Sequence, residues 1–196
     1  MSIAENKKIL KKNEALLLLS GGLDSAACLD FLVSNSYKVK CLFINYGQAA
    51  LKKERSSARK ISKFYKSPLQ ELNLQNIKIK KAGYIQGRNL FLFSTALMVA
   101  KFKKGIISSG IHKGTSYLDC SPLFHAKVQE IYDIYTEGRI RVFSPFAEWN
   151  KNDIWEYCQQ KNVPINLTYS CERGGKPCGK CLSCIDLKYL YAGKIK

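Results

Sequence analysis

The chain has 196 residues, 46% of them hydrophobic and 24% charged, and its 32 Lys and Arg against 15 Asp and Glu give a formal net charge of +17. The length suits one domain with a sizeable core, and the composition is ordinary for a soluble globular protein. The longest apolar run, residues 90–100, is too short to span a bilayer, and residues 1–13 lack the apolar stretch of a signal peptide. We therefore expect a cytoplasmic protein with no membrane partner.

Apolar runs alternate with helical patterns along the chain, which indicates an α/β fold with a parallel sheet. Strands are expected at residues 15–19, 39–45, 69–74, 105–109 and 141–143, with the third nearer an edge because its apolar and polar residues alternate. Helices are expected at residues 24–33, 51–64, 90–102, 124–136, 151–161 and 181–191. The helix 90–102 is apolar almost all round and should be buried. The predicted fold is an open, mostly parallel five-stranded sheet flanked by helices, in one domain of residues 1–196.

The loop after the first strand has the composition of a phosphate site. Its two consecutive glycines allow the backbone N–H groups to approach an anion, and the helix that follows offers its positive N-terminus. Two serines add hydroxyl donors. Asp24 would repel a phosphate unless a cation lay between them, so we expect Mg²⁺ here. The loop consists of Ser20, Gly21, Gly22, Leu23, Asp24 and Ser25.

Four of the eight cysteines crowd together near the C-terminus, within a segment that we place at residues 168–192. They are Cys171, Cys178, Cys181 and Cys184. In a reducing cytosol, closely spaced cysteines indicate a metal site rather than disulfides. Four soft thiolates favour structural Zn²⁺, although an iron–sulfur cluster is also compatible with three closely spaced cysteines.

The complete string Ser-Gly-Gly-Leu-Asp-Ser, placed between a buried strand and a helix, resembles the PP-loop signature of the N-type ATP pyrophosphatases. It lacks the Gly-Lys-Ser/Thr ending of a Walker loop. The resemblance implies an adenine nucleotide alpha hydrolase-like fold. It also implies that ATP is cleaved to AMP and pyrophosphate, with AMP passing to a substrate oxygen.

Further motifs, in order along residues 15–192, resemble the QueC family. They are Tyr46-Gly47-Gln48 followed by Glu54, Gly87-Arg88-Asn89 before an apolar helix, Tyr117-Leu118-Asp119-Cys120, and the glycine- and cysteine-rich stretch within 168–184. The resemblance implies catalytic roles for Asp24, Ser25, Arg88 and Asp119. It implies that ATP is bound by the loop 20–25 together with Tyr46, Gly47, Gln48, Arg88 and Asn89. It further implies that the second substrate contacts Arg88, Tyr117 and Asp119, with Asp119 accepting from ring N–H and amino groups.

The family's reaction converts 7-carboxy-7-deazaguanine to its nitrile. ATP adenylates the carboxylate, ammonia displaces AMP to give an amide, and a second ATP activates the amide for dehydration. Four features depart from the family pattern: a short segment 73–87, Lys113 in place of an acidic residue, Leu118 in place of proline, and Ser121 in place of arginine. All four surround the deazaguanine side of the pocket, so ATP use is better supported than the nitrile product.

Other functions remain open at this point. A QueC-like enzyme of antiviral defence would transfer the activated carboxylate to a protein amine, and a tRNA-modifying PP-loop ATPase or a non-catalytic nucleotide-binding protein are further alternatives. The charge of +17 is compatible with an acidic protein or nucleic acid as partner, and equally with a lysine-rich proteome. A homodimer is also open. His125 is expected to be structural, whereas His112 follows a strand end and could line the site.

Overall fold

A computed structural model describes residues 13–74, 76, 79, 83–114 and 117–193. Five strands form one sheet in the order β3-β2-β1-β4-β5, and all four neighbouring pairs are parallel. The prediction of an open parallel sheet is confirmed, as is the edge position of the third strand. The strands are β1 (Glu14–Leu18), β2 (Lys38–Asn45), β3 (Leu69–Asn73), β4 (Gly105–Ser108) and β5 (Ile140–Phe143).

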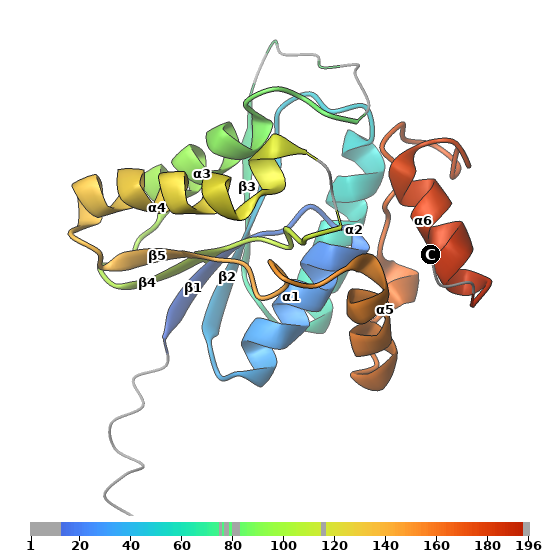
Figure 1. The fold of residues 1–196 in the computed structure, drawn as a ribbon, viewed down its shortest axis with the longest axis horizontal. Helices are drawn as coiled ribbons and strands as arrows, with labels where there is room; N and C mark the ends of the chain where they lie inside the picture. Colours follow the sequence, from blue (N-terminus) through green and yellow to red (C-terminus); the bar gives the residue numbers. More distant parts are fainter. Residues whose placement is uncertain (1–12, 75, 77–78, 80–82, 115–116, 194–196) are drawn as a thin grey trace, which may run out of the picture.

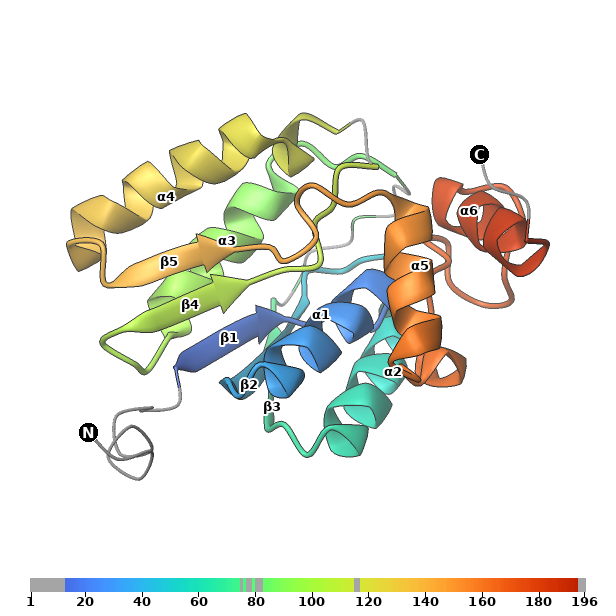
Figure 2. The same cartoon turned by 60° about the horizontal axis from the view of Figure 1, so that its bottom comes forward.

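Helices cover both faces of the sheet, which makes a three-layered α/β structure (Figure 1). The first face packs against α1 (Leu23–Ser34), α2 (Leu51–Phe64) and α5 (Lys151–Gln160), and the second against α3 (Arg88–Val99) and α4 (Pro122–Thr136). Near the C-terminus, α6 (Leu182–Tyr191) lies outside these layers, beside α5 (Figure 2). Short 3₁₀ turns occupy Leu118–Cys120 and Ile165–Leu167.

Strand β1 shows why the apolar runs are nearly continuous. Its alternate residues Ala15 and Leu17 are buried in the core formed with α1, α2 and α5, while Leu16 is buried in the core formed with α3 and α4. Side chains alternate between the faces of a strand, and both faces of this sheet are covered. Every residue of the strand interior must therefore be apolar.

Helix α3 is less buried than its composition predicts. Phe93 and Ala96 are buried against the sheet, but Met98 is 78% exposed and Leu90 is 43% exposed. The expectation that this helix is buried is therefore wrong for the part of its surface that carries Met98 and Leu90, because the sheet and α4 cover only part of the helix. Apolar composition alone does not specify how many neighbours surround a helix. Within the described ranges, no helix is both long and apolar enough to cross a membrane.

The strand order reverses at β1. From β1 the chain first adds β2 and β3 on one side of the sheet, and then returns to add β4 and β5 on the other side. In open α/β sheets, a crevice forms at such a switch point, beyond the carboxyl ends of the strands. The loop 20–25 follows β1, and the segment that begins at Ser109 follows β4. The fold therefore places the predicted phosphate loop in the position where this class of sheet binds ligands.

Candidate active site at the switch point

The loop between β1 and α1 is folded around the hydroxyl of Ser25. This hydroxyl donates to the Gly22 carbonyl at 2.9 Å and accepts from the Gly21 N–H at 3.2 Å, and the Ser20 hydroxyl lies 3.1 Å away. Gly22 is the N-cap residue of α1, and as a glycine it has no side chain to cap the helix. The cap residue therefore supplies no side-chain acceptor to the first turn of α1, where only the Leu23 N–H has a long contact, 3.4 Å, to Ser170 Oγ among the described side chains. A helix start of this kind can bind a phosphate.

Two glycines allow this loop to sit where it does. Gly21 has a φ of +87°, and a Cβ there would lie 2.5 Å from the Glu54 carbonyl oxygen, so the loop packs directly on α2. A Cβ on Gly110, which follows β4, would lie 2.6–2.8 Å from backbone atoms of Asp24 and Ser25. The chain after β4 is therefore in backbone contact with the start of α1, and side chains larger than hydrogen do not fit between them.

Asp24 forms an ion pair with a residue that the motifs did not point to. Lys151 Nζ lies 2.6 Å from both carboxylate oxygens of Asp24, and the two side chains are 19% and 27% exposed. Lys151 is the first residue of α5, whose start is held by a capping box between Asn150 and Asp153. Because the cap orients the first turn, the Lys151 ammonium is directed at the phosphate loop from across the crevice.

His112, which the sequence left as a possible site residue, lies beside the same carboxylate. Its Nε2 is 3.9 Å from Asp24 Oδ2, and its Nδ1 accepts from the Gly114 N–H at 3.0 Å. Because Nδ1 is an acceptor, the neutral ring carries its proton on Nε2, toward Asp24. Burial lowers the pKa of His112, against the opposing effect of Asp24. His112 therefore stands in the site as a neutral donor.

The motif Tyr46-Gly47-Gln48 follows β2, and its glutamine is used inside the protein. The Gln48 side chain accepts from the Tyr46 N–H at 3.0 Å and donates to the Ile44 carbonyl at 3.2 Å and to Glu54 Oε2 at 3.0 Å. These bonds shape the turn and orient Glu54. Burial raises the pKa of Glu54, while the Gln48 amide and the Arg88 charge lower it.

Arg88 and Asn89 begin α3, and both take part in contacts with neighbouring segments. Burial raises the pKa of Tyr46. Arg88 opposes this rise, because its charge and its hydrogen bond to the Tyr46 hydroxyl favour the ionised form. The Asn89 side chain donates to the Asp119 carbonyl at 2.9 Å, and its N–H donates to Asp119 Oδ2 at 3.4 Å. Asp119 is only 7% exposed, and its carboxylate faces the positive start of α3.

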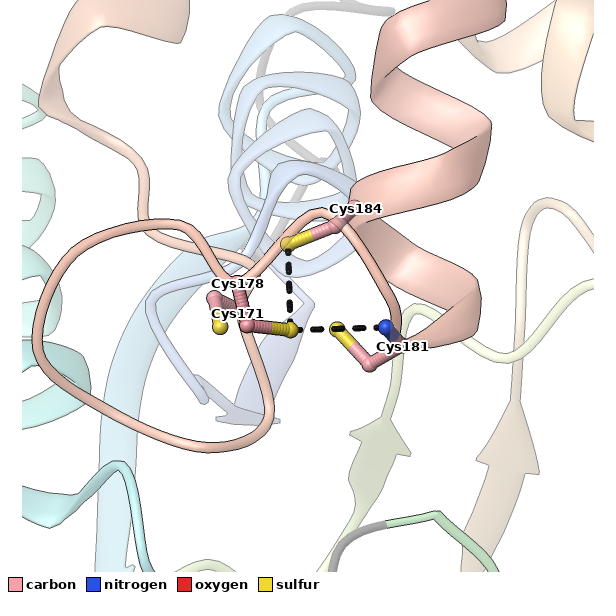
Figure 3. Close-up of side chains that lie close together, drawn as sticks. All are labelled: Cys171, Cys178, Cys181 and Cys184. Atoms are coloured by element: carbon pink, nitrogen blue, oxygen red, sulfur yellow. Dashed lines mark hydrogen bonds between the residues drawn. The ribbon is translucent and has the colours of Figure 1, made fainter.

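The four clustered cysteines have the geometry of a metal centre (Figure 3). All four Sγ atoms lie within 4.8 Å of one another, and those of Cys178 and Cys184 are 3.9 Å apart. Zn–S bonds of about 2.3 Å place tetrahedral sulfurs roughly 3.8 Å apart. The N–H groups of Lys180 and Cys181 donate to Cys178 Sγ at 3.4 Å each and lower the pKa of this thiol to about 6. The prediction of a four-cysteine segment that could hold a metal ion is confirmed.

The chain just before this cysteine cluster clamps the phosphate loop. The Tyr169 N–H donates to the Gly21 carbonyl at 2.9 Å, and the Leu23 N–H donates to Ser170 Oγ at 3.4 Å. On the far side of Cys171, a Cβ on Gly174 would lie 2.7 Å from the Ala49 carbonyl oxygen, so the cysteine segment also packs on the loop after β2. The cysteine segment and the residues just before it thus contact the loops after β1 and β2 through one backbone–backbone hydrogen bond, one backbone–side-chain hydrogen bond and the close packing at Gly174.

The structure brings together the predicted loop residues, Glu54, Arg88, Asn89 and the segment 117–119 around the carboxyl ends of β1, β2 and β4. Sequence reasoning missed Lys151 and Ser170. Neither belongs to a spacing pattern that identifies a ligand. The available signal for Lys151 was its position at the start of a helix that follows a strand of the sheet. Ser170 had no signal beyond its place next to Cys171.

Comparison with known proteins agrees with the resemblance drawn from these motifs. The family model described as queuosine biosynthesis protein QueC matches residues 14–83 and 66–191. A 7-cyano-7-deazaguanine synthase of Prochlorococcus marinus (strain MIT 9515) is 31% identical over 208 residues, which cover 89% of this chain and 92% of that protein. The synthase of Acetivibrio thermocellus is 29% identical, with 87% and 89% covered.

Among solved structures, a predicted subunit of tRNA methyltransferase from Methanocaldococcus jannaschii matches with a TM-score of 0.53. The two chains are 13% identical, and the match covers 76% of each, so this likeness concerns the fold alone. The QueC family model, by contrast, spans nearly all the described residues, and the matched residues include the loop after β1 and the four-cysteine segment. The chain belongs to the QueC family.

Proposed function

We propose that this protein is an ATP-dependent carbon–nitrogen ligase that converts 7-carboxy-7-deazaguanine and ammonia to 7-cyano-7-deazaguanine, for queuosine or related deazapurine synthesis. The observation that carries the proposal is the uncapped start of α1 at the β1/β4 switch point, with Asp24 and Lys151 beside it, in a chain of the QueC family. Such a site binds the phosphates of a nucleotide and holds a cation and a carboxylate near them.

In this mechanism a carboxylate oxygen of the substrate attacks the α-phosphorus of ATP, and pyrophosphate leaves. Ammonia then displaces AMP to give the amide, whose oxygen attacks a second ATP. When the second AMP leaves, two N–H protons are lost and the nitrile forms. Each AMP therefore carries away one oxygen of the original carboxylate. Two molecules of ATP become two of AMP and two of pyrophosphate.

The residues of the loop have separable roles in this scheme. The N–H groups of Gly21 to Ser25 and the hydroxyls of Ser20 and Ser25 would bind the phosphates, in exchange for the bonds they make within the loop. Asp24 would exchange its ion pair with Lys151 for the Mg²⁺ that accompanies ATP. Lys151 would then contact a phosphate oxygen and stabilise the charge that develops as pyrophosphate leaves.

Around the second substrate, Arg88 would pair with the carboxylate before its activation, since a guanidinium is suited to that group. Tyr46, Gly47, Gln48 and Asn89 would shape the walls of the nucleotide pocket, and Tyr117 would contact the deazapurine. Asp119 is proposed to act through α3, because its carboxylate faces the Asn89 N–H. The closed set of four thiolates fits structural Zn²⁺, which would hold the clamp on the loop and take no part in the chemistry.

Incubation of the purified protein with ATP, 7-carboxy-7-deazaguanine and ammonium, followed by mass spectrometry, tests the proposal. We expect the nitrile, with two AMP formed for each nitrile. An amide without nitrile, or a mass adduct on an added acidic protein, would instead support transfer to a different acceptor. Two residues that depart from the family pattern, Leu118, which is 80% exposed, and Ser121, which caps α4, lie within two positions of Asp119 in the sequence and are the first candidates for the cause of such a change. Absence of AMP under all these conditions would refute the ligase.

The remaining assignments are proposals of the same kind. We propose that residues 1–196 work as a single domain in the cytoplasm. The exposed apolar side chains of α3 and α4, among them Met98 and Ile134, offer a surface for a second copy of the chain. Size-exclusion chromatography with light scattering would test the homodimer.

A further inference from the structure

One carboxylate near the proposed substrate pocket comes from the cysteine segment itself. Glu172 follows the metal-ligating Cys171 directly, and its side chain is half-buried. Its Oε1 accepts from the Ser183 hydroxyl at 3.0 Å, and Ser183 lies in the first turn of α6 between Cys181 and Cys184. The cysteine cluster thus fixes both the residue that carries the carboxylate and the residue that orients it.

The second oxygen of Glu172 points toward the segment that carries Tyr117. A Cβ placed on Gly83 would lie 3.5 Å from the Tyr117 hydroxyl and 3.9 Å from Glu172 Oε2, so these two polar atoms flank the same backbone. Among the residues that the structure describes, Oε2 has no hydrogen-bond partner. Glu172 also raises the pKa of the Tyr117 hydroxyl, after burial, which places its charge close to that ring.

An aromatic surface accompanies this carboxylate. The rings of Tyr84 and Tyr117 have centroids 5.4 Å apart and an interplanar angle of 45°, and both side chains are half-buried. A flat heterocycle can pack on such faces. A carboxylate with a free oxygen beside them is suited to a ring that presents adjacent N–H and amino donors, because an ionised carboxylate only accepts hydrogen bonds.

Asp119, to which the sequence assigned this reading role, is less accessible than Glu172. Its side chain is 7% exposed, and its Oδ2 accepts from the Asn89 N–H while Asn89 also binds its carbonyl. The other carboxylate oxygen of Asp119, Oδ1, is buried and has no hydrogen-bond partner among the described residues. Glu172 is more exposed than Asp119, and its Oε2 also has no partner among the described residues, so Glu172 is the more accessible acceptor.

We propose that Glu172 is the specificity-determining residue that reads the N–H and amino edge of the deazaguanine ring, and that Ser183 is its positioning residue. The assignment rests on the proposed function, because it presumes a ring of this donor pattern. It gives the cysteine segment a second role beyond supporting the phosphate loop. Arg88, whose charge acts on Glu54 and Tyr117 as that of Glu172 does, would pair with the carboxylate of the same ligand.

Calorimetric binding of 7-carboxy-7-deazaguanine tests this assignment, together with the analogue that lacks the 2-amino group. Glu172→Gln replaces one acceptor by a donor, so we expect binding of the full ligand to weaken about 10- to 100-fold. The wild type should prefer the full ligand to the analogue about 10-fold, and the variant should lose most of that preference. Ser183→Ala should weaken binding a few-fold and reduce the preference. The control is Glu156→Gln, an exposed carboxylate of α5.

Several outcomes separate the possibilities. If the wild type does not bind the deazaguanine, the proposed function itself fails. If the wild type binds it and Glu172→Gln retains both affinity and preference, the function stands and the role of Glu172 is overturned. Zinc content and binding of a non-hydrolysable ATP analogue are measured for each variant, because a merely structural defect would lower both. If Glu172→Gln does not retain zinc, the test falls to Ser183→Ala. If Ser183→Ala then keeps the wild-type preference for the full ligand over the analogue that lacks the 2-amino group, the proposal is overturned.

Discussion

Replacement of Lys151 by methionine tests the ammonium that faces the phosphate loop. Lys151 Nζ makes two 2.6 Å contacts to Asp24, and both side chains are largely shielded from solvent, so the substitution removes a charge at the point where the nucleotide phosphates would bind. Methionine keeps the length of the side chain and most of its apolar contacts. The helix start is unaffected, because the capping box involves Asn150 and Asp153 and not Lys151.

The expected size of the effect follows from the contact that is lost. A hydrogen bond to a charged group contributes about 1.5–3 kcal/mol, and about 1.4 kcal/mol corresponds to tenfold. We therefore expect kcat/KM for ATP to fall about 10- to 100-fold in Lys151→Met, with partial recovery in Lys151→Arg. Asp24 is 27% exposed and can be hydrated once its partner is gone, so the melting temperature should change by less than about 4 °C.

Pyrophosphate release, measured with a coupled assay at varied ATP, provides the readout. Lys161→Met serves as a matched control, because Lys161 is an exposed lysine at the opposite end of α5. Its kcat/KM should remain within about twofold of the wild type, the range expected for an exposed side chain without such contacts. If Lys151→Met behaves like this control, or loses activity only in proportion to unfolded protein, the role assigned to the ammonium is refuted.

Three further changes have expected outcomes. Gly110→Ala should abolish ATP binding by calorimetry, because its Cβ would lie 2.6–2.8 Å from backbone atoms of Asp24 and Ser25, whereas Gly175→Ala, which strains a left-handed residue with a φ of +74° but meets no atom within 4 Å, should keep it. Removal of the metal with a strong chelator should lower both the melting temperature and the affinity for ATP, and added Zn²⁺ should restore both; unchanged ATP affinity would contradict the clamp at Tyr169 and Ser170. Burial lowers the pKa of His125 below its ordinary 6.5, so the unfolded chain protonates this ring at a higher pH than the folded protein does, and the stability that the neutral ring contributes is present above about pH 6.5 and declines as the pH falls below it. Urea unfolding should therefore show a smaller loss of stability between pH 7.5 and 5.5 for His125→Phe than for the wild type.

Local patterns were sufficient for most of the fold. The apolar run before Ser20 and the helical spacing of residues 51–64 predicted β1 and α2, and each expected strand or helix is found within about three residues of its predicted ends. These elements follow from side-chain periodicity and from glycine-rich turns, which are properties of neighbouring residues. The burial of α3 was predicted wrongly because it depends on how many elements surround the helix, which periodicity does not encode.

The sequence by itself determined the glycine-rich loop after β1, which we propose binds phosphate, and the set of four thiolates that could hold a metal ion, because both are short segments defined by their residue types and spacing. Only the tertiary structure decided which distant residues accompany them. Lys151 meets Asp24 across 127 positions of the chain, and Ser170 meets Leu23 across 147. Such contacts arise from the strand order and from the packing of the cysteine segment on the loops after β1 and β2. No local pattern carries that information, since it depends on how all the elements fold together.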